Sequence, residues 1–222
     1  MTGPEVITID GPSGAGKSTI SRLLAARLNY IYLDTGAMYR AVGLKASNNK
    51  IDLDDAVSLQ ALLNELDLEL LPGNQDAKVM LDGKDVSLDI RSPAMGMMAS
   101  KVSAYGAVRE KMTLLQQQIA EQGSIVAEGR DMGTVVFPLA RHKFYLSASP
   151  EERARRRTQQ LSEQGMSADY ADILEQIKKR DYDDSARALA PLKPAADAVL
   201  IDCTKMDIAA VLQFMLDNIS AS

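Results

Sequence analysis

The sequence contains one cysteine, Cys203, and one histidine, His142, among its 222 residues. A single cysteine cannot form a disulfide within the chain, so we expect a reducing compartment such as the cytoplasm. A single histidine excludes a metal site built mainly from histidines. Cys203 follows an apolar run at residues 198–201 that is typical of a strand, and we therefore expect its thiol to be buried and unreactive.

The sequence also lacks long apolar segments and an excess of positive charge. No apolar run approaches the roughly 20 residues that a helix needs to cross a membrane, and residues 1–5 do not begin a signal peptide. Twenty-five basic and thirty acidic side chains give a net charge of −5. Proteins that bind nucleic acid usually carry a positive field. We therefore expect a cytoplasmic protein that binds neither a membrane nor a nucleic acid.

Short apolar runs alternate with helical patterns along most of the chain. This alternation predicts an α/β fold, in which helices cover a parallel sheet. We expect strands near residues 6–10, 30–33, 124–127, 142–146 and 198–201. We expect helices near residues 17–28, 36–47, 95–122, 151–161, 171–180 and 208–219.

The pattern changes between about residues 67 and 90. Leucines alternate with acidic residues at 66–70, and apolar residues alternate again up to Ile90. Between them, Asp82 and Gly83 form a pair that is typical of a hairpin turn. The segment therefore predicts a small antiparallel sheet inserted into the α/β chain.

Residues 11–18 read G-P-S-G-A-G-K-S and match the phosphate-binding pattern G-x-x-x-x-G-K-[ST] at every fixed position. In such a P-loop the glycines let backbone N–H groups surround phosphate oxygens, and the following helix adds its positive end. Lys17 would reach the β- and γ-phosphates of ATP, and the Ser18 hydroxyl would bind Mg²⁺ directly. A glycine-rich turn without a ligand is the alternative, but the position between a strand and a helix favours phosphate. The predicted nucleotide-binding residues are Gly11, Pro12, Ser13, Gly14, Ala15, Gly16, Lys17, Ser18 and Thr19.

Other classes of nucleotide-binding protein fit the sequence less well. Residues 49–52 match the guanine-reading N-K-x-D pattern of GTPases. They follow a predicted helix rather than a strand, and no D-x-x-G precedes them, so we interpret the match as a helix end. Small size and acidic charge argue against a nucleic-acid-dependent ATPase. A non-catalytic nucleotide sensor would need the P-loop but no second anion site.

Arginines near the predicted ends of strands and helices offer a second anion site. They are Arg40, Arg130, Arg180 and Arg187. In an open α/β sheet the ligand crevice lies outside the carboxyl ends of the strands, and the guanidinium fork matches a phosphate group. Each arginine alone is more simply explained as a surface residue paired with an acid. Several of them at such positions in an acidic protein favour a second phosphate site.

Residues 153–157 carry four further arginines. Because Glu151 and Glu152 precede them, the segment would form a solvated helix face with internal ion pairs. Alternatively, it would form a short mobile lid that covers the triphosphate and neutralises charge in the transition state. We favour the lid because of a family resemblance.

That resemblance is carried by four segments, at residues 7–17, 33–40, 128–138 and 179–191. In this order they resemble the bacterial cytidylate (CMP/dCMP) kinases, a family of P-loop nucleoside monophosphate kinases. The resemblance implies a single domain with a P-loop NTPase three-layer fold, whose core spans about 1–62, 103–150 and 168–222. It implies an inserted monophosphate-binding subdomain at about 63–102 and an arginine-rich lid at about 151–167. It further implies a monomer that transfers phosphate from ATP to CMP or dCMP, with Mg²⁺, in pyrimidine metabolism.

The resemblance also implies roles for individual residues. Lys17, Arg130 and Arg157 would neutralise the transferred phosphate, and Glu128, where aspartate is more usual, would order Mg²⁺ through water. Thr35, where serine is more usual, would contact the sugar. The full set of predicted acceptor residues is Thr35, Tyr39, Arg40, Ser100, Arg109, Arg130, Asp131, Arg180, Asp184 and Arg187. Of these, Ser100, Arg109 and Asp131 would read cytosine. A related P-loop kinase with another small acceptor is the alternative, and a nucleotide sensor is the third possibility.

Overall fold

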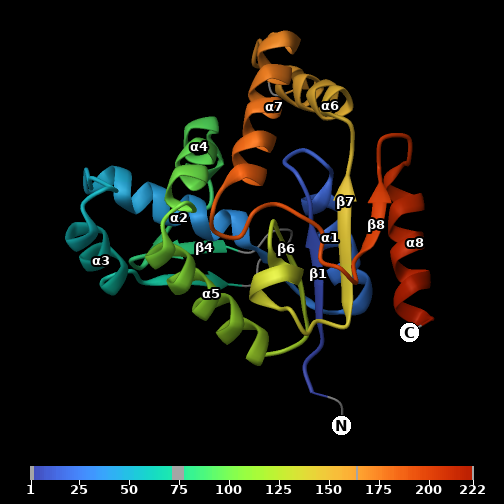
Figure 1. Ribbon diagram of the computed structural model, residues 1–222, viewed down its shortest axis with the longest axis horizontal. Coiled ribbons are helices and arrows are strands. Elements are labelled where there is room, and N and C mark those ends of the chain that lie inside the picture. The colour runs from blue at the N-terminus through green and yellow to red at the C-terminus, as the bar shows by residue number, and fades with distance from the viewer. Residues whose placement is uncertain (1–2, 72–77, 164, 222) are drawn as a thin grey trace. The chain divides into compact units, whose positions relative to one another are not determined.

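The computed structural model describes residues 3–71, 78–163 and 165–221 and divides the chain into two compact units (Figure 1). Unit 1 comprises Met1–Tyr32 and Ala120–Ser222, and unit 2 comprises Leu33–Ile119. The predicted residues 72–77 of the insertion lie outside the described residues. No helix in the described ranges is long and apolar enough to cross a membrane.

The central sheet has five strands in the order β2-β6-β1-β7-β8. They are β1 (Val6–Asp10), β2 (Ile31–Asp34), β6 (Ile125–Gly129), β7 (His142–Ser147) and β8 (Val199–Asp202). β1 pairs in parallel with β6 on one side and with β7 on the other, and β7 pairs in parallel with β8. The predicted parallel sheet is therefore confirmed. Its strand order places the end of β1, where the P-loop begins, between the ends of β6 and β7.

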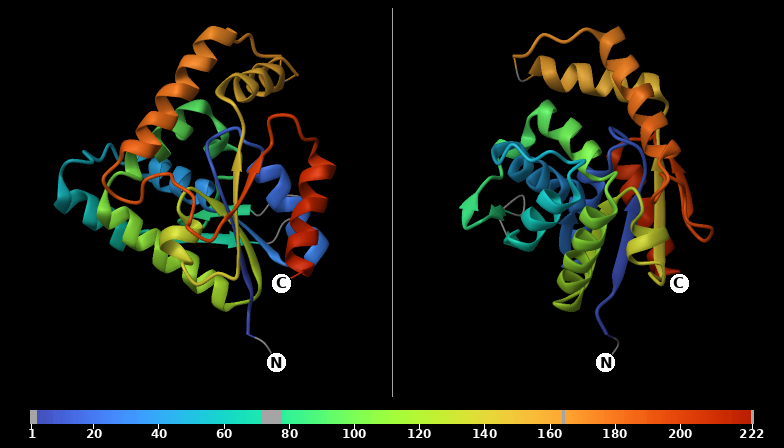
Figure 2. Two further views of the ribbon diagram at one scale, coloured as in Figure 1. Left: turned by 45° about the vertical axis from the view of Figure 1, so that its right-hand side comes forward. Right: turned by 60° about the vertical axis from the view of Figure 1, so that its left-hand side comes forward.

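The core of unit 1 forms where α1 (Lys17–Leu28) and α8 (Ile208–Ser220) pack beside the sheet (Figure 2). Ile7 and Ile9 of β1 are fully buried there, together with Leu24 of α1 and Met215 of α8. Burying such side chains contributes about 1.5–3 kcal/mol each to folding. The same cluster includes Cys203, and burial raises the pKa of its thiol, which agrees with the expectation of a buried strand-end cysteine.

Unit 1 also contains three elements that carry site residues. They are the π-helical turn η2 (Met132–Val136), α6 (Pro150–Glu163) and α7 (Tyr170–Ala186). Helix α7 begins at its cap Asp169, whose carboxylate accepts the backbone N–H groups of Ala171 and Asp172. It continues past Arg180, where the sequence predicted its end, and therefore includes Asp184 as well.

Unit 2 contains four helices and a small antiparallel sheet of three strands among the residues that the structure describes. The helices are α2 (Thr35–Asn48), α3 (Ala56–Asn64), α4 (Pro93–Val102) and α5 (Gly106–Glu121). The sheet pairs β3 (Leu68–Leu71) with β4 (Lys78–Leu81) and β4 with β5 (Lys84–Asp85). The predicted antiparallel sheet is thus confirmed, and Asn49 caps the end of α2, as we interpreted the N-K-x-D match.

Two local predictions for unit 2 were wrong, and one helix was missed. Apolar alternation up to Ile90 does not continue the last strand, because the Asp85 carboxylate accepts the N–H and the hydroxyl of Ser87 and turns the chain into the 3-10 turn η1 (Asp89–Arg91). The helical pattern at 95–122 is two helices separated by turn bonds at residues 103–105. Helix α3 was not predicted, although Asp55 caps it.

Gly11 is required where β1 leaves the sheet. Its φ angle is +146°, and a Cβ at this position would lie 2.0 Å from the carbonyl oxygen of Leu146 in β7. Gly83 in the β4–β5 turn also has a positive φ angle of +75°, but a Cβ there would meet no atom within 4 Å. A side chain at position 11 would therefore be opposed by both the backbone conformation and a steric clash, whereas one at position 83 would be opposed by the backbone conformation alone.

We expect Gly11→Ala to lower the free energy of unfolding by about 2–5 kcal/mol, because backbone strain and the Leu146 clash add. Gly83→Ala should cost about 1–2 kcal/mol from the left-handed backbone alone. Gly3→Ala, which has neither feature, should stay within about 0.5 kcal/mol of the wild type. Urea unfolding followed by circular dichroism measures all three. Equal losses for Gly11→Ala and Gly83→Ala would contradict the assigned clash.

Candidate functional site

The P-loop connects β1 to α1 and wraps around the side chain of Lys17. Gly14 and Gly16 have φ angles of +79° and +95°, in the left-handed region. The Lys17 ammonium group is buried and donates to the Pro12 carbonyl at 2.7 Å. Burial, and after it the charge of Arg130, lower the pKa of Lys17 to about 7. An anion bound beside this lysine would restore its charged form, so the loop is suited to hold phosphate.

Asp10, the last residue of β1, fixes the chain that follows β6. Its carboxylate accepts the backbone N–H groups of Met132 at 2.9 Å and Gly133 at 2.8 Å. Burial raises the pKa of Asp10 to about 6, although these two hydrogen bonds act in the opposite direction. Asp131 directly precedes this anchored segment and is itself buried. Asp10 therefore sets the position of Asp131.

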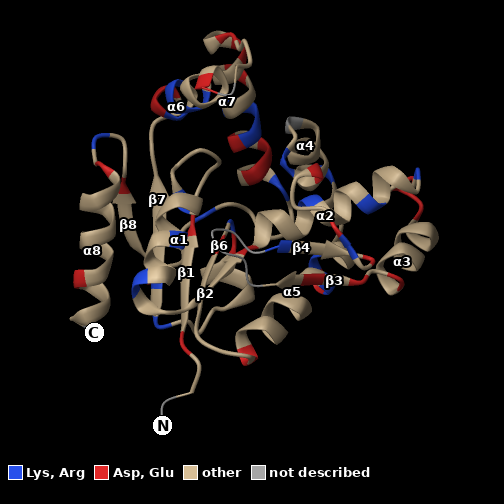
Figure 3. Ribbon diagram, turned by 180° about the vertical axis from the view of Figure 1, so that it is seen from behind, with Lys and Arg blue, Asp and Glu red and all other residues tan. Residues whose placement is uncertain are grey.

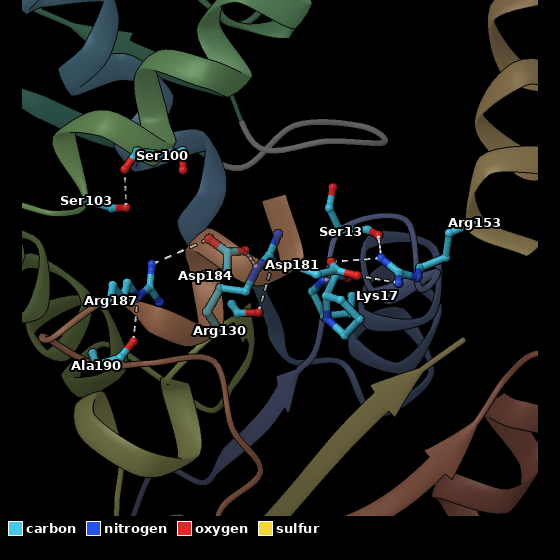
Figure 4. A network of polar contacts seen from close by, with 12 residues as sticks. Ser13, Lys17, Ser100, Ser103, Arg130, Arg153, Asp181, Asp184, Arg187 and Ala190 are labelled. Carbon is cyan, nitrogen blue, oxygen red and sulfur yellow. Dashed lines mark hydrogen bonds and ion pairs between the residues drawn. The ribbon is translucent and has the colours of Figure 1, made fainter. Parts of the chain in front are cut away.

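Arg130 and Arg187 lie beside Asp184 (Figure 4), and the charge of Arg180 also acts on its carboxylate. The Asp184 carboxylate lies 2.8 Å from Nε of Arg130 and 3.8 Å from Nη1 of Arg187. Burial raises the pKa of Asp184, but Arg130, Arg180 and Arg187 outweigh it and hold the pKa below the ordinary value. Arg187 also donates to the carbonyl of Ala190 at 2.7 Å. One carboxylate thus holds the guanidinium groups of Arg130 and Arg187 in place.

The predicted metal-binding residues suit Mg²⁺ carried by a nucleotide. Ser18 lies in the first turn of α1 and is exposed. The buried carboxylate of Glu128, at the end of β6, accepts a hydrogen bond from the Tyr32 hydroxyl. Among the residues that the structure describes, no three His, Cys, Asp or Glu side chains form a metal cluster. Because Mg²⁺ usually takes one or two protein ligands and completes its shell with phosphates and water, these residues fit it.

The other predicted acceptor residues belong to unit 2, where they form two groups. Asp34 caps α2 through the N–H of Ala37 and pairs with Arg40 at 3.0 Å. Thr35 is buried as the first residue of this helix.

In the second group, the Arg109 guanidinium lies 5.8 Å from the centre of the Tyr39 ring, and its Nη1 donates to the carbonyl of Ser103. The Ser103 hydroxyl in turn donates to the carbonyl of Ser100 at 2.8 Å. The structure therefore brings Tyr39, Ser100 and Arg109 together within unit 2.

The arginines of α6 differ in their surroundings, although all four follow closely behind the two acids of the first helical turn (Figure 3). Arg155 and Arg156 pair with Glu152 of the same helix, as expected for a solvated face. Arg157 donates to Gln160 at 2.7 Å. Arg153 is buried and binds the P-loop and α7 instead. The lid function of this segment stays a prediction.

Sequence reasoning missed Asp10, Arg153 and Asp181, which hold the site together. Asp10 stands directly before the P-loop, so a carboxylate at a buried strand end was the available signal. Arg153 was hidden among the other arginines of its helix. Asp181 lies beside Arg180 in a segment that was used for the family resemblance, but nothing in the sequence identified its partner.

We expect Asp184→Asn to lower the free energy of unfolding at pH 7 by about 2–4 kcal/mol, because it leaves Arg130 and Arg187 without their shared carboxylate. The pKa of Asp184 is held below its ordinary 3.8, so the carboxylate stabilises the fold above that pH and loses its effect as pH falls further. The difference between wild type and variant should therefore shrink below about pH 3.8. Urea unfolding at pH 7, 5 and 3.5 measures it, and a difference that grows with acidity would refute the assignment.

Comparison with known proteins gives close relatives for nearly the whole chain. A family model described as cytidylate kinase matches residues 7–221. The cytidylate kinase of Caldicellulosiruptor bescii is 48% identical over 95% of this chain and 93% of its own length. That of Pasteurella multocida is 45% identical over 99% of this chain and 96% of its own.

Solved structures show the same fold at much lower identity. An uncharacterized protein from Eubacterium ventriosum has a TM-score of 0.56 at 13% identity, covering 98% of this chain and 99% of that one. A shikimate kinase from Bacteroides thetaiotaomicron has a TM-score of 0.50, also at 13% identity, covering 97% of this chain and 98% of that one. At such identities the likeness concerns the fold alone.

Proposed function

The chain belongs to the cytidylate kinase family, and from this premise we propose that it transfers the γ-phosphoryl group of ATP to CMP or dCMP. The products are ADP and CDP or dCDP, in pyrimidine nucleotide metabolism. One observation carries the proposal: the P-loop lysine lies in the same unit as the arginines that bind Asp184, and Figure 4 shows Lys17 and Arg130 in one group of polar side chains. The charge of Arg130 accordingly lowers the pKa of Lys17. Two phosphate-binding groups side by side are what a transfer between two phosphates requires.

The donor is held by residues 11–19, with the triphosphate along the backbone N–H groups of the loop and Lys17 at the β- and γ-phosphates. Mg²⁺ would bind the Ser18 hydroxyl, with Glu128 ordering its water shell. When bound, the ion would supply positive charge against the phosphates. Because burial and Arg130 disfavour the Lys17 charge in the free protein, the triphosphate supplies the counter-charge that this site lacks.

The acceptor phosphate would bind Arg130 with Arg40, and Arg180 and Arg187 would contact phosphate and sugar. Asp184 holds the guanidinium groups of Arg130 and Arg187 in place and would contact the sugar. Thr35 and Tyr39 would line the sugar pocket, and Ser100 and Arg109 would contact the base. The support for these roles is the family resemblance together with the arginine cluster around Asp184.

The reaction requires no nucleophile from the protein. An oxygen of the CMP phosphate forms a bond to the γ-phosphorus while the bond from that phosphorus to the bridging oxygen of ADP breaks. Catalysis then consists of alignment and charge neutralisation, for which we propose Lys17, Arg130 and Arg157. Arg157, in the proposed lid, would reach the triphosphate when α6 closes over it.

Asp131 would select cytosine over uracil. The N4 amino group of cytosine is a donor, and a carboxylate accepts it. Uracil presents an oxygen at the same place, which would leave the buried Asp131 carboxylate facing a lone pair. Asp10 supports this role because it anchors the two backbone N–H groups that directly follow Asp131. We further propose a cytoplasmic monomer, in line with the family resemblance.

An assay of ADP release with CMP, dCMP, UMP, AMP and GMP tests the function. We expect turnover with CMP and dCMP, much slower turnover with UMP, and none with the purines. Lys17→Ala should retain its fold by circular dichroism and lose at least about 100-fold in kcat, because an oriented charge is removed from the transferred phosphate. Selective turnover of a different acceptor would support a related P-loop kinase, and ATP binding without any turnover would support a nucleotide sensor.

We expect Asp131→Ala to raise the KM for CMP about 10- to 100-fold and to change the KM for ATP less than about threefold, because the lost hydrogen bond concerns the base of the acceptor alone. Steady-state kinetics with each substrate varied in turn measures both constants. Asp131→Asn, which keeps the volume but removes the negative charge, is the matched variant. An equal rise in both KM values would mean that Asp131 does not read the base.

A further inference from the structure

Arg153 is the most completely bonded arginine of α6. It is 2% exposed, yet each nitrogen of its guanidinium group has a partner. Nε donates to the carbonyl of Ala148 at 2.8 Å. Nη1 donates to the carbonyl of Ser13 at 3.1 Å and to Asp181 at 3.0 Å, and Nη2 donates to the other Asp181 oxygen at 2.6 Å. A buried charge that is fully paired in this way is rigid, because any shift leaves polar groups unsatisfied.

The partners of Arg153 come from three separate elements of unit 1. Ser13 belongs to the P-loop, Ala148 follows β7, and Asp181 belongs to α7. The aliphatic part of Arg153 also covers the loop, since a Cβ on Gly14 would lie 3.3 Å from Cβ of Arg153. Figure 4 shows the guanidinium group between Ser13 and Asp181. The side chain thus bridges the donor loop and α7.

Helix α7 also carries the arginine cluster. Asp181 lies one helical turn before Asp184, and residues three apart share a helix face. Asp184 in turn binds Arg130 and Arg187. Hydrogen bonds therefore connect the Ser13 carbonyl to Arg153 and Arg153 to Asp181. One turn of α7 then connects Asp181 to Asp184.

We infer that Arg153 and Asp181 are positioning residues that hold the P-loop and the arginine cluster at a fixed separation, an inference that rests on the proposed phosphoryl transfer. In-line transfer demands that donor and acceptor phosphates meet within a narrow range of distances, and a misplacement of about 1 Å costs about 100-fold in rate. Arg153 therefore differs from the other arginines of its helix. It acts through the loop and α7 rather than by contact with the transferred phosphate.

A purely structural role would give a different result. If the pair only fastened α6 to α7, its loss would lower stability and leave the turnover of the folded protein nearly unchanged. If it positions the two phosphate sites, kcat falls in protein that remains folded. Lysine cannot reproduce the planar fork, so Arg153→Lys keeps the charge but breaks the bridge to Ser13 and Asp181.

The test compares Arg153→Lys, Asp181→Asn and the double variant with the wild type. Asp197→Asn and Asp197→Ala are the matched controls, because Asp197 accepts two hydrogen bonds from Lys143 of β7 in a pair that touches neither the loop nor α7. For each protein, kcat and both KM values are measured with ATP and CMP. The folded fraction under assay conditions is measured by urea unfolding.

We expect each single variant to lose about 10- to 100-fold in kcat, with smaller changes in both KM values. The double variant should lose no more than the worse single variant, because the two residues act as one bridge. The controls should stay within about twofold of the wild type. If Arg153→Lys does not fold, the nearly isosteric Asp181→Asn still decides the question.

A kcat within twofold of the wild type in folded Asp181→Asn would overturn the inference, and so would losses that multiply in the double variant. Wild-type turnover is measured first, which separates this inference from the proposed function. If CMP is not turned over but another nucleotide of the panel is, the same variants are compared with that acceptor. A wild type that turns over no acceptor overturns both proposals.

Discussion

The ammonium group of Lys17 is buried where its charged form is disfavoured. The other charged groups of the candidate site are arranged around this lysine and the loop that carries it. Arg130 and Arg180 disfavour its charge, while Glu128 and Asp10 support it less than burial opposes it. With its pKa lowered to about 7, the lysine is only partly charged near neutral pH, and an added anion would favour its charged form. A triphosphate in the P-loop is such an anion, so nucleotide binding and the charge state of the loop are one event.

Carboxylates near this region hold cations and backbone in place. Asp184 orders the guanidinium groups of Arg130 and Arg187, Asp181 orders that of Arg153, and Asp10 orders the backbone after Asp131. Each carboxylate fixes the position of the guanidinium or backbone N–H groups that it binds, and Asp184 and Asp181 also neutralise part of the arginine charge. Positive groups that are already ordered need no rearrangement when a phosphate arrives, and such preorganisation is the main source of electrostatic catalysis.

The local patterns of the sequence predicted the strand–loop–helix unit at residues 6–28 with almost no error, because its signals are local. An apolar strand, a glycine-rich turn and an amphipathic helix each leave a direct mark on the sequence. Patterns failed where a side chain redirected the backbone. Ser87 bonding to Asp85 ends a strand whose apolar alternation continues, and the turn at residues 103–105 splits a helix whose periodicity does not stop.

The residues of the proposed site were named from the sequence largely through the family resemblance, whose segments have a fixed order and spacing. The sequence by itself determined the P-loop, the identity of the family and the supply of arginines for a second anion site, because these depend on residue types at fixed intervals. Only the tertiary structure decided which partners each arginine binds. Arg153 and Arg155 are two residues apart in one helix, yet one is buried against Ser13 and Asp181 and the other pairs with Glu152 at the surface. That difference arises because the partners of Arg153 lie 140 and 28 residues away along the chain, and separations of that size leave no periodicity in a sequence.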